Sequence, residues 1–312
     1  MRIAFFGTPD FAVPSLNALL RSSHQVVLVV TQPDRPRGRG HRVSAGPVKK
    51  VAEAHGIPVV QPEKLTREPW EVALGPHDIE LGVVAAYGKI LPDWLLAMPR
   101  LGLINVHASL LPRYRGASPI HRAVMNGDAV TGVTIMRVVK ALDAGAMMGT
   151  ATVPIGPDDR TDAVERALAL AGAELLVTIV DRLAAGPVQE VAQDESAATY
   201  APRLRKDEGL VDWSRPAQAI HNQIRGLHPW PHAFTYAPHG RIILHRSSVA
   251  SQESRAVAGL VVAASASEGL RVSTGEGDLE LLEVQAEGGK VLPSPVFLTA
   301  HPLKTGDRLG AP

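Results

Sequence analysis

The stretch from Met1 to Thr31 reads MRIAFFGTPDFAVPSLNALLRSSHQVVLVVT, and it indicates the architecture of the first two-thirds of the chain. The apolar run at 2–6 predicts a strand, the turn at 7–9 ends it, and a helix is expected over 10–20. The β-branched run at 25–31 predicts a second strand, of the buried kind typical of parallel sheets. A strand, a helix and a strand in this order predict a right-handed crossover.

The same alternation continues to about residue 185. Further helices are expected at Pro47–His55, Pro92–Met98 and Asp162–Ala185. Further strands are expected at Ile57–Val60, Leu81–Ala86, Leu101–His107, Thr131–Val138 and Met147–Val153. Strands that alternate with helices predict an α/β fold with a doubly wound, mostly parallel sheet.

The pattern changes near residue 190. Residues 186–209 hold Gly186, Pro187 and Pro202 among polar residues, which is typical of a linker. A helix is expected at Pro216–Gly226, and short apolar segments separated by glycine-rich turns come after it. Such segments predict a small β-barrel or sandwich, and the pattern leaves both open.

Composition excludes several classes of protein. The 312 residues include no cysteine, which excludes disulfide frameworks, thiolate metal sites and cysteine nucleophiles. Hydrophobic residues make up 45%, too many for a disordered chain. No apolar run reaches the roughly 18–20 residues of a membrane span, and the amino terminus lacks a cleavable signal pattern. We therefore expect a soluble, cytoplasmic protein. The net charge of +1 by itself indicates no nucleic-acid partner.

The segment LINVHASLLP (103–112) carries the first candidate site. Asn105 and His107 alternate onto one face of a strand, at its carboxyl end. Ligands of doubly wound sheets bind at that edge. The pattern alone leaves open whether the two residues form a site or close a strand end through structural hydrogen bonds. Asp143, before a small residue and Gly145, likewise fits either a turn or a functional carboxylate.

Three motifs together resemble the 10-formyltetrahydrofolate-dependent formyltransferases. They are Asn105-x-His107, Ser109-Leu110-Leu111-Pro112 and Leu142-Asp143-x-Gly145. Further segments resemble the members of that family that act on tRNA: FGTPDF (6–11), TQPDRP (31–36), GRG (38–40), PVK (47–49), AYG (86–88) and PWP (229–231).

The resemblance implies a layout and a reaction. It implies a Rossmann-like catalytic domain over 1–189, a linker over 190–206 and an OB-like tRNA-binding domain over 207–312. The implied reaction moves the formyl group of 10-formyltetrahydrofolate to the free amine of the methionine carried by initiator tRNA. Asn105 and His107 would stabilise the oxyanion, assisted by Asp143. This chemistry requires neither a metal nor a covalent enzyme intermediate.

The resemblance also implies binding residues. The folate would contact Tyr87 and the loop of Ser109, Leu110, Leu111 and Pro112. Phe11 would line a pocket for the methionine side chain. For Phe11 and the two leucines, ordinary core packing remains the alternative.

One segment is strongly basic. Residues 34–50 carry six Lys or Arg and one acid. A connection of this length is unusual where strand and helix are normally joined by about 2–6 residues. It is either a solvated loop or a phosphate-binding one. The resemblance favours contact with the acceptor arm of tRNA through Arg35, Arg37, Arg39, Arg42 and Lys49, with Arg39 as the leading candidate.

The sequence of the second domain gives less evidence for a binding site. Residues 201–312 hold 12 Lys or Arg and 11 acids, so they are not basic on balance. His228 and His232 flank Pro229-Trp230-Pro231 without a metal-like partner in the sequence, and we interpret them as structural. We expect a monomer with no membrane partner.

Three rival interpretations stay open from the residues. Formyl transfer to glycinamide ribonucleotide or to a nucleotide sugar would use the same core residues. A folate- or RNA-binding protein without catalysis is a second class. An NAD oxidoreductase would suit the fold, but the chain lacks the glycine fingerprint of a dinucleotide site.

Overall fold

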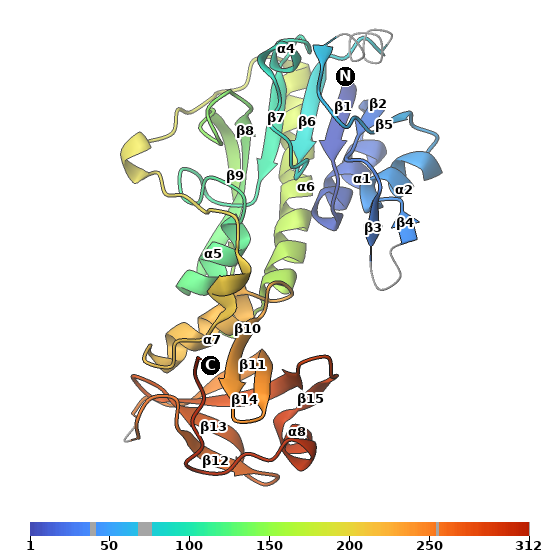
Figure 1. Cartoon of the computed structure of the whole chain (residues 1–312). Coiled ribbons are helices and arrows are strands. Elements are labelled where there is room, and N and C mark those ends of the chain that lie inside the picture. The colour runs from blue at the N-terminus through green and yellow to red at the C-terminus, as the bar shows by residue number, and fades with distance from the viewer. Residues whose placement is uncertain (38–41, 68–76, 254–255, 312) are drawn as a thin grey trace. The chain divides into compact units, whose positions relative to one another are not determined.

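The computed structural model describes residues 1–37, 42–67, 77–253 and 256–311 (Figure 1). The chain divides into two compact units. The first consists of Met1–Gly116, Val130–Pro154 and Glu165–Ala201, and the second of Ala117–Ala129, Ile155–Val164 and Pro202–Pro312. The chain therefore passes between the units several times. The sequence predicts one passage, through 190–206, and that boundary stays a prediction.

The first unit is built on one seven-stranded sheet, in the order β5-β2-β1-β6-β7-β8-β9. The strands are β1 (Arg2–Gly7), β2 (Gln25–Val30), β5 (Val59–Val60), β6 (Leu81–Ala85), β7 (Leu103–His107), β8 (Val130–Arg137) and β9 (Met147–Pro154). The five neighbouring strands β5, β2, β1, β6 and β7 are parallel to one another, whereas β8 pairs antiparallel with both β7 and β9. The expected α/β fold with a mostly parallel sheet is confirmed.

Helices cover this sheet. They are η1 (Asp10–Ala12), α1 (Val13–Arg21), α2 (Pro47–Ala54), α4 (Asp93–Leu96) and α6 (Thr161–Ala185), with the short η3 (Glu195–Ala197) near the end of the unit. Within the first unit, α6 approaches β7 and β8 closely at Gly172. A Cβ there would lie 2.9 Å from Val106 and 3.2 Å from Val133. Glycine lets the helix backbone approach the sheet, and burial of both strand faces explains their apolar sequence.

The strand order creates a switch point beside β1. The chain runs from β1 to β2 and β5 on one side, and returns to β6 on the other. Loops at the carboxyl ends of β1 and β6 therefore diverge, which is where doubly wound sheets bind ligands. Gln32 ties these loops together. Its backbone N donates to Thr8 Oγ1 (3.2 Å), and its side chain donates to the Tyr87 carbonyl (2.9 Å).

The basic segment, for which the sequence predicts a loop, contains a hairpin. Strands β3 (Arg35–Arg37) and β4 (Arg42–Ser44) pair antiparallel, with Arg37 opposite Arg42. Lys49 lies near the hairpin's base and donates to Asp34 (2.6 Å) and Gln61 (2.7 Å). These bonds anchor the segment to the helix and strand that come after it.

The second unit carries an antiparallel sheet in the order β10-β11-β14-β13-β12, with β15 paired to β14. Its strands are β10 (Ala233–Ala237), β11 (Gly240–Ser251), β12 (Val261–Ser265), β13 (Gly269–Ser273), β14 (Asp278–Ala286) and β15 (Val291–Pro293). Its helical segments include α5 (Pro119–Asn126), η4 (Lys206–Gly209), α7 (Ala217–Gly226) and α8 (Ser294–Ala300). The expected small β domain is confirmed, while its closure into an OB-like barrel stays a prediction.

The core of the second unit lies between α7 and this sheet. Ile220, Leu244, Leu279 and Phe297 are among its buried residues. The sequence pattern does not reveal α5, α8 and β10, because short amphipathic segments between turns have no distinctive period. Within the described residues, no helix combines the length and the apolar character that a membrane crossing requires.

Candidate active site

Two polar side chains stand at the carboxyl end of β7. Asn105 is half-buried and His107 is 5% exposed. In the sheet, Asn105 lies opposite Val84 of β6 and Met136 of β8. Because side chains alternate along a strand, both residues lie on one face, as the sequence predicts.

Hydrogen bonding fixes the orientation of the His107 ring. Its Nε2 lies 3.1 Å from the backbone carbonyl of Tyr114. A carbonyl only accepts, so Nε2 carries a proton and donates it. The other nitrogen, Nδ1, lies 3.7 Å from Asp143 Oδ2. The fold thus brings together two residues that the sequence separates by 36 positions.

Burial decides the charge of this imidazole. Burial lowers the pKa of His107, while the Asp143 carboxylate and the Tyr114 carbonyl act in the opposite direction. The net direction is downward from the usual 6.5. At neutral pH the ring is therefore neutral, with a proton on Nε2 and a lone pair on Nδ1.

Asp143 is held in an uncommon backbone conformation. Its φ of +48° lies in the left-handed region, which costs a non-glycine residue free energy. The backbone N of Gly116 donates to its Oδ2 (2.8 Å). Two residues on, Gly145 lies against β8, where a Cβ would come within 1.9 Å of the Arg137 carbonyl. Only glycine fits there, which explains the Asp-x-Gly spacing.

Residues 190–201, which we name the strap, hold both parts of the site. Gln193 Nε2 donates to the carbonyls of Asp143 and Gly145, each at 2.8 Å. Tyr114 N donates to Thr199 Oγ1 (2.9 Å), and Arg115 N donates to the Thr199 carbonyl (2.8 Å). The strap therefore links the turn that carries Asp143 to the loop that orients His107.

A buried arginine anchors the strap. The side chain of Arg115 is 2% exposed and lies 2.7 Å from Glu195 Oε1. It also donates to Gln193 Oε1 from Nε (3.0 Å) and Nη2 (2.8 Å). The hydrogen bond to Glu195 raises the pKa of Arg115, and the reverse contact lowers the pKa of Glu195.

Sequence reasoning missed Arg115, Gln193 and Thr199 as parts of the site. It treated 190–206 as a linker, because its polar composition resembles a solvated segment. Gln193 and Thr199 instead bind backbone groups, and Gln193 and Glu195 bind the Arg115 side chain. Such contacts leave no periodic signal in the sequence.

The loop expected to bind folate is held from β8. Thr134 Oγ1 donates to the Ser109 carbonyl (2.7 Å) and accepts from Leu111 N (3.1 Å). Ser109 Oγ donates to the Arg113 carbonyl (2.6 Å). Ser109 and Leu111 are buried, whereas Leu110 and Pro112 are partly exposed.

Tyr87 and Phe11 lie in the interior. The Tyr87 ring is 2% exposed and meets Phe6 edge-on, with 5.8 Å between ring centroids. Burial raises the pKa of Tyr87 to about 12. Phe11, in η1, is 6% exposed. Both rings therefore contribute to packing, and their contact with a ligand stays a prediction.

The candidate tRNA residues occupy different settings. Arg35 is exposed on β3. Arg37 and Arg42 stand opposite each other in the hairpin. Lys49 is 18% exposed, and its hydrogen bond to Asp34 raises its pKa. Its ammonium group is thus already engaged within the first unit. Arg39 lies outside the described residues.

Comparison with known proteins places this chain in a family. The formyl transferase model matches residues 1–180, and the model of the formyl transferase C-terminal domain matches residues 203–302. The chain belongs to the formyltransferase family. It is 45% identical to a methionyl-tRNA formyltransferase of Citrifermentans bemidjiense over 99% of this chain and 96% of that protein. It is likewise 45% identical to one from Moorella thermoacetica, over 99% of each chain.

Solved structures share the fold at low identity. An N-formyltransferase from Helicobacter canadensis, in complex with folinic acid and dTDP-3-aminofucose, matches with a TM-score of 0.65 at 16% identity. The match covers 89% of this chain and 98% of that one. HypX from Aquifex aeolicus, in complex with tetrahydrofolic acid, matches with a TM-score of 0.64 at 15% identity, over 100% of this chain and 51% of that one.

Proposed function

We propose that this chain transfers the formyl group of 10-formyltetrahydrofolate to the free amine of methionyl-initiator-tRNA. The observation that carries the proposal is the 45% identity to methionyl-tRNA formyltransferases along nearly the whole of both chains. His107 and Asp143 lie side by side, and Asn105 is on the same strand as His107. These three side chains supply the groups that such a reaction needs.

The amine of the methionyl group attacks the formyl carbon, and negative charge develops on the formyl oxygen. The amide of Asn105 is a neutral donor on the face of β7 that also carries His107, and we assign it to that oxygen. Such a donor acts without a change of protonation state, so its contribution does not depend on pH near neutrality.

His107 moves the proton. With Nε2 bound to Tyr114, Nδ1 is the nitrogen that can accept the proton lost by the amine. The Asp143 carboxylate, 3.7 Å from Nδ1, stabilises the imidazolium that results. The imidazolium adds its own charge to oxyanion stabilisation, and returns the proton to N10 as the C–N10 bond breaks. The proton balance closes without a metal or a covalent enzyme intermediate.

Substrate binding is assigned to the surrounding loops. Leu110 and Pro112 are the partly exposed members of the folate loop, beside a sheet edge of the kind that binds ligands. The basic segment, in which Arg35 is exposed, is assigned to phosphates of the acceptor arm, and Arg39 of the GRG motif remains its leading candidate. Within this proposal the chain acts as a monomer in the cytoplasm, where tRNA is charged.

One assay tests the function. The full chain is mixed with 10-formyltetrahydrofolate and methionyl-initiator-tRNA, and formylmethionine on the tRNA is measured. Elongator methionyl-tRNA and a second charged tRNA serve as controls, and we expect the initiator species to react fastest. No transfer to the initiator species would overturn the proposal. Transfer to glycinamide ribonucleotide or to an amino sugar nucleotide instead would place the chain elsewhere in the family.

A further inference from the structure

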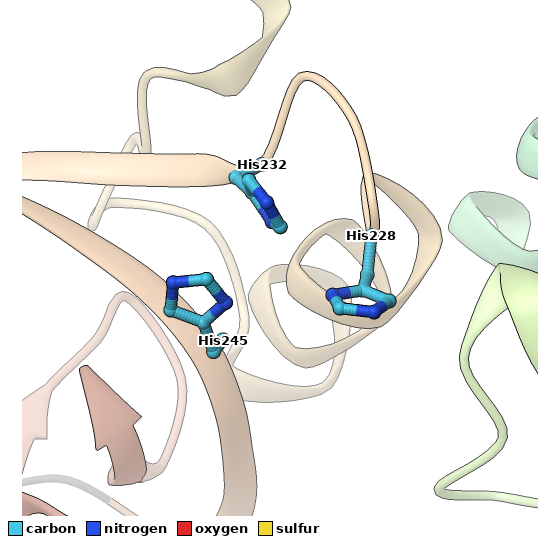
Figure 2. A group of neighbouring side chains, drawn as sticks. All are labelled: His228, His232 and His245. Carbon is cyan, nitrogen blue, oxygen red and sulfur yellow. The ribbon is translucent and has the colours of Figure 1, made fainter. Parts of the chain in front are cut away.

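Three histidines of the second unit converge on one place (Figure 2). His228 follows α7, His232 precedes β10, and His245 lies in β11. One ring nitrogen from each lies within 4.8 Å of those of the other two. Figure 2 shows the three rings turned toward one another from these separate segments. The sequence places His245 thirteen residues after His232, without metal-like spacing, and only the pairing of β10 with β11 brings them together.

The hydrogen bonds of His245 identify its available nitrogen. Gln285 donates from its Nε2 to the Gly289 carbonyl (2.8 Å), so its Oε1 faces the histidine. That oxygen lies 2.8 Å from His245 Nε2 and can only accept. His245 therefore carries its proton on Nε2 and a lone pair on Nδ1. A partner that fixes the tautomer in this way is typical of histidines that bind metals.

The other two histidines also present a buried nitrogen. The Nδ1 atoms of His228 and His232 are buried and have no hydrogen-bond partner in the structure. Buried polar atoms are normally paired, so two unpaired nitrogens facing one cluster require a reason. The Nε2 of His228 lies 3.8 Å from Asp162 Oδ1, which places a carboxylate behind the ring.

The charges around the cluster suit a bound cation. Asp162 and Glu283 place negative charge near His228. Arg160 opposes them, but its Nε lies 3.6 Å from Asp162 Oδ1, which offsets its charge.

Ring-to-ring contact alone offers a simpler account of the cluster. The ring centroids of His232 and His245 lie 4.5 Å apart and those of His228 and His232 lie 5.3 Å apart, with both pairs tilted at 58°. Such contacts account for the distances between the rings, but they give no partner to the buried Nδ1 atoms of His228 and His232. A single ion would satisfy both of them and the Nδ1 of His245.

We propose that His228, His232 and His245 form a binding site for a divalent transition metal ion, with Zn²⁺ as the best match. Imidazole nitrogen suits Zn²⁺, and three histidines leave a fourth tetrahedral position for water. Nitrogens that share a tetrahedral Zn²⁺ lie about 3.3 Å apart, so nitrogens that now lie within 4.8 Å of one another must approach by up to about 1.5 Å when the ion binds. The site would join the turn after α7 to β10 and β11, and it takes no part in the proposed formyl transfer.

The test measures metal directly. The full chain is prepared without a polyhistidine tag, stripped with a chelator and titrated with Zn²⁺ against a chromophoric chelator. We expect one tightly bound ion per chain. Substitution of His232→Ala or His245→Gln is expected to weaken binding at least about 100-fold, and Gln285→Leu about 10–100-fold through loss of tautomer control.

A matched control and a second signal make the test decisive. His239 is exposed in the turn between β10 and β11, and His239→Ala should leave Zn²⁺ affinity unchanged. Circular dichroism of each variant without metal checks that it folds. Co²⁺ bound to the wild type should show the visible absorption of a tetrahedral site. The proposal would be overturned if the wild type bound no Zn²⁺ tightly. It would also be overturned if the folded His232→Ala and His245→Gln variants kept the wild-type affinity for Zn²⁺.

Discussion

Under the proposed function, His107 at the end of β7 and Asp143 beside it act together on one proton. His107 offers a neutral Nδ1 because burial holds its pKa down and the Tyr114 carbonyl holds its other nitrogen protonated. Asp143 supplies the charge that favours the protonated ring. The proposed proton transfer therefore needs both residues, since a buried imidazole requires a counter-charge to accept a proton.

Removing the charge of Asp143 should lower the pKa of His107 further. The carboxylate raises that pKa, so Asp143→Asn takes away a favourable partner of the imidazolium. NMR titration of the His107 ring should show a lower pKa in the variant than in the wild type. Resonances of the exposed His239 serve as the control and should not differ between the two proteins. An unchanged or higher pKa for His107 would contradict the proposed pairing.

Loss of the Asn105 amide should slow the chemical step. If it donates to the oxyanion, Asn105→Ala lowers kcat by roughly 10²–10³. Single-turnover formylation at saturating folate and tRNA measures this directly, with thermal unfolding as the check on folding. A rate within about threefold of the wild type would exclude Asn105 as an oxyanion donor, because the loss of one such donor slows the reaction far more.

At the scale of elements, the strap sets the geometry of the site. It pairs with β9 through Val191 and Met147, and with the loop after β7 through Arg115 and Thr199. Its hydrogen bonds hold Asp143 in the left-handed conformation that directs the carboxylate toward His107. The strap, which lies outside the sheet, therefore positions the Asp143 carboxylate and the His107 ring. Hydrogen bonds of the sheet alone would not fix either side chain.

Substitution of Gln193→Ala should reduce activity more than stability. It removes the donor to the carbonyls of Asp143 and Gly145, and a displacement of about 1 Å at a reacting group can cost roughly 100-fold in rate. We expect kcat to fall by about 10–100-fold, with little change in KM for the folate. The exposed Gln189→Ala is the matched control, and equal kinetics for both variants would show that the strap is not needed for positioning.

The second unit contains a pH-sensitive contact between α5 and η4. Arg122 lies 2.5 Å from Glu208, and this hydrogen bond lowers the pKa of Glu208. A carboxyl whose pKa is depressed on folding stabilises the protein above its unfolded pKa of about 4.3, and loses that contribution as pH falls through the folded value.

Glu208→Gln should therefore destabilise the protein at neutral pH, by about 1–3 kcal/mol, with a difference from wild type that shrinks below about pH 4. Urea unfolding at several pH values measures this. Glu287→Gln, at an exposed position beyond β14, is the control. A difference that stays constant down to acid pH would mean that the contact with Arg122 does not depend on the charge of Glu208.

At the scale of the whole molecule, the net charge conceals an uneven distribution. The total is +1, yet residues 34–50 alone carry +5. In the structure part of that charge is committed internally, because Lys49 binds Asp34 and Gln61. Arg35 is exposed on β3, and under the proposed function its charge, which persists at any physiological pH, is available to a polyanionic partner.

Neutralising Arg39 should weaken tRNA binding selectively. Arg39→Ala is expected to raise KM for the tRNA and to reduce its salt dependence by about one phosphate contact, with KM for the folate unchanged. Arg182→Ala removes the same charge from the exposed last turn of α6 and serves as the control. Equal changes in the two Michaelis constants would argue against a role for the basic segment in tRNA binding.

Local sequence patterns were enough to predict the sheet of the first unit. The β-branched run at 25–30 and the apolar run at 2–6 are buried on both faces, so their composition reveals the parallel strands directly. The same holds for β6 and β7, and alternation along β7 correctly placed Asn105 and His107 on one face. The hairpin of β3 and β4 escaped detection, because its strands are only three residues long and polar.

What the sequence could establish alone was therefore local: the order of strands and helices, the polar residues at the end of β7, and the family to which its motifs point. The tertiary structure decided the contacts between distant segments. It gave the geometry of the Asp143–His107 contact that the family resemblance implied. It also showed that residues predicted to form a linker make the strap, that Lys49 binds Asp34, and that His228, His232 and His245 lie together. The physical reason is that periodicity reports burial, whereas hydrogen bonds and ion pairs between distant residues depend on how the chain folds back on itself.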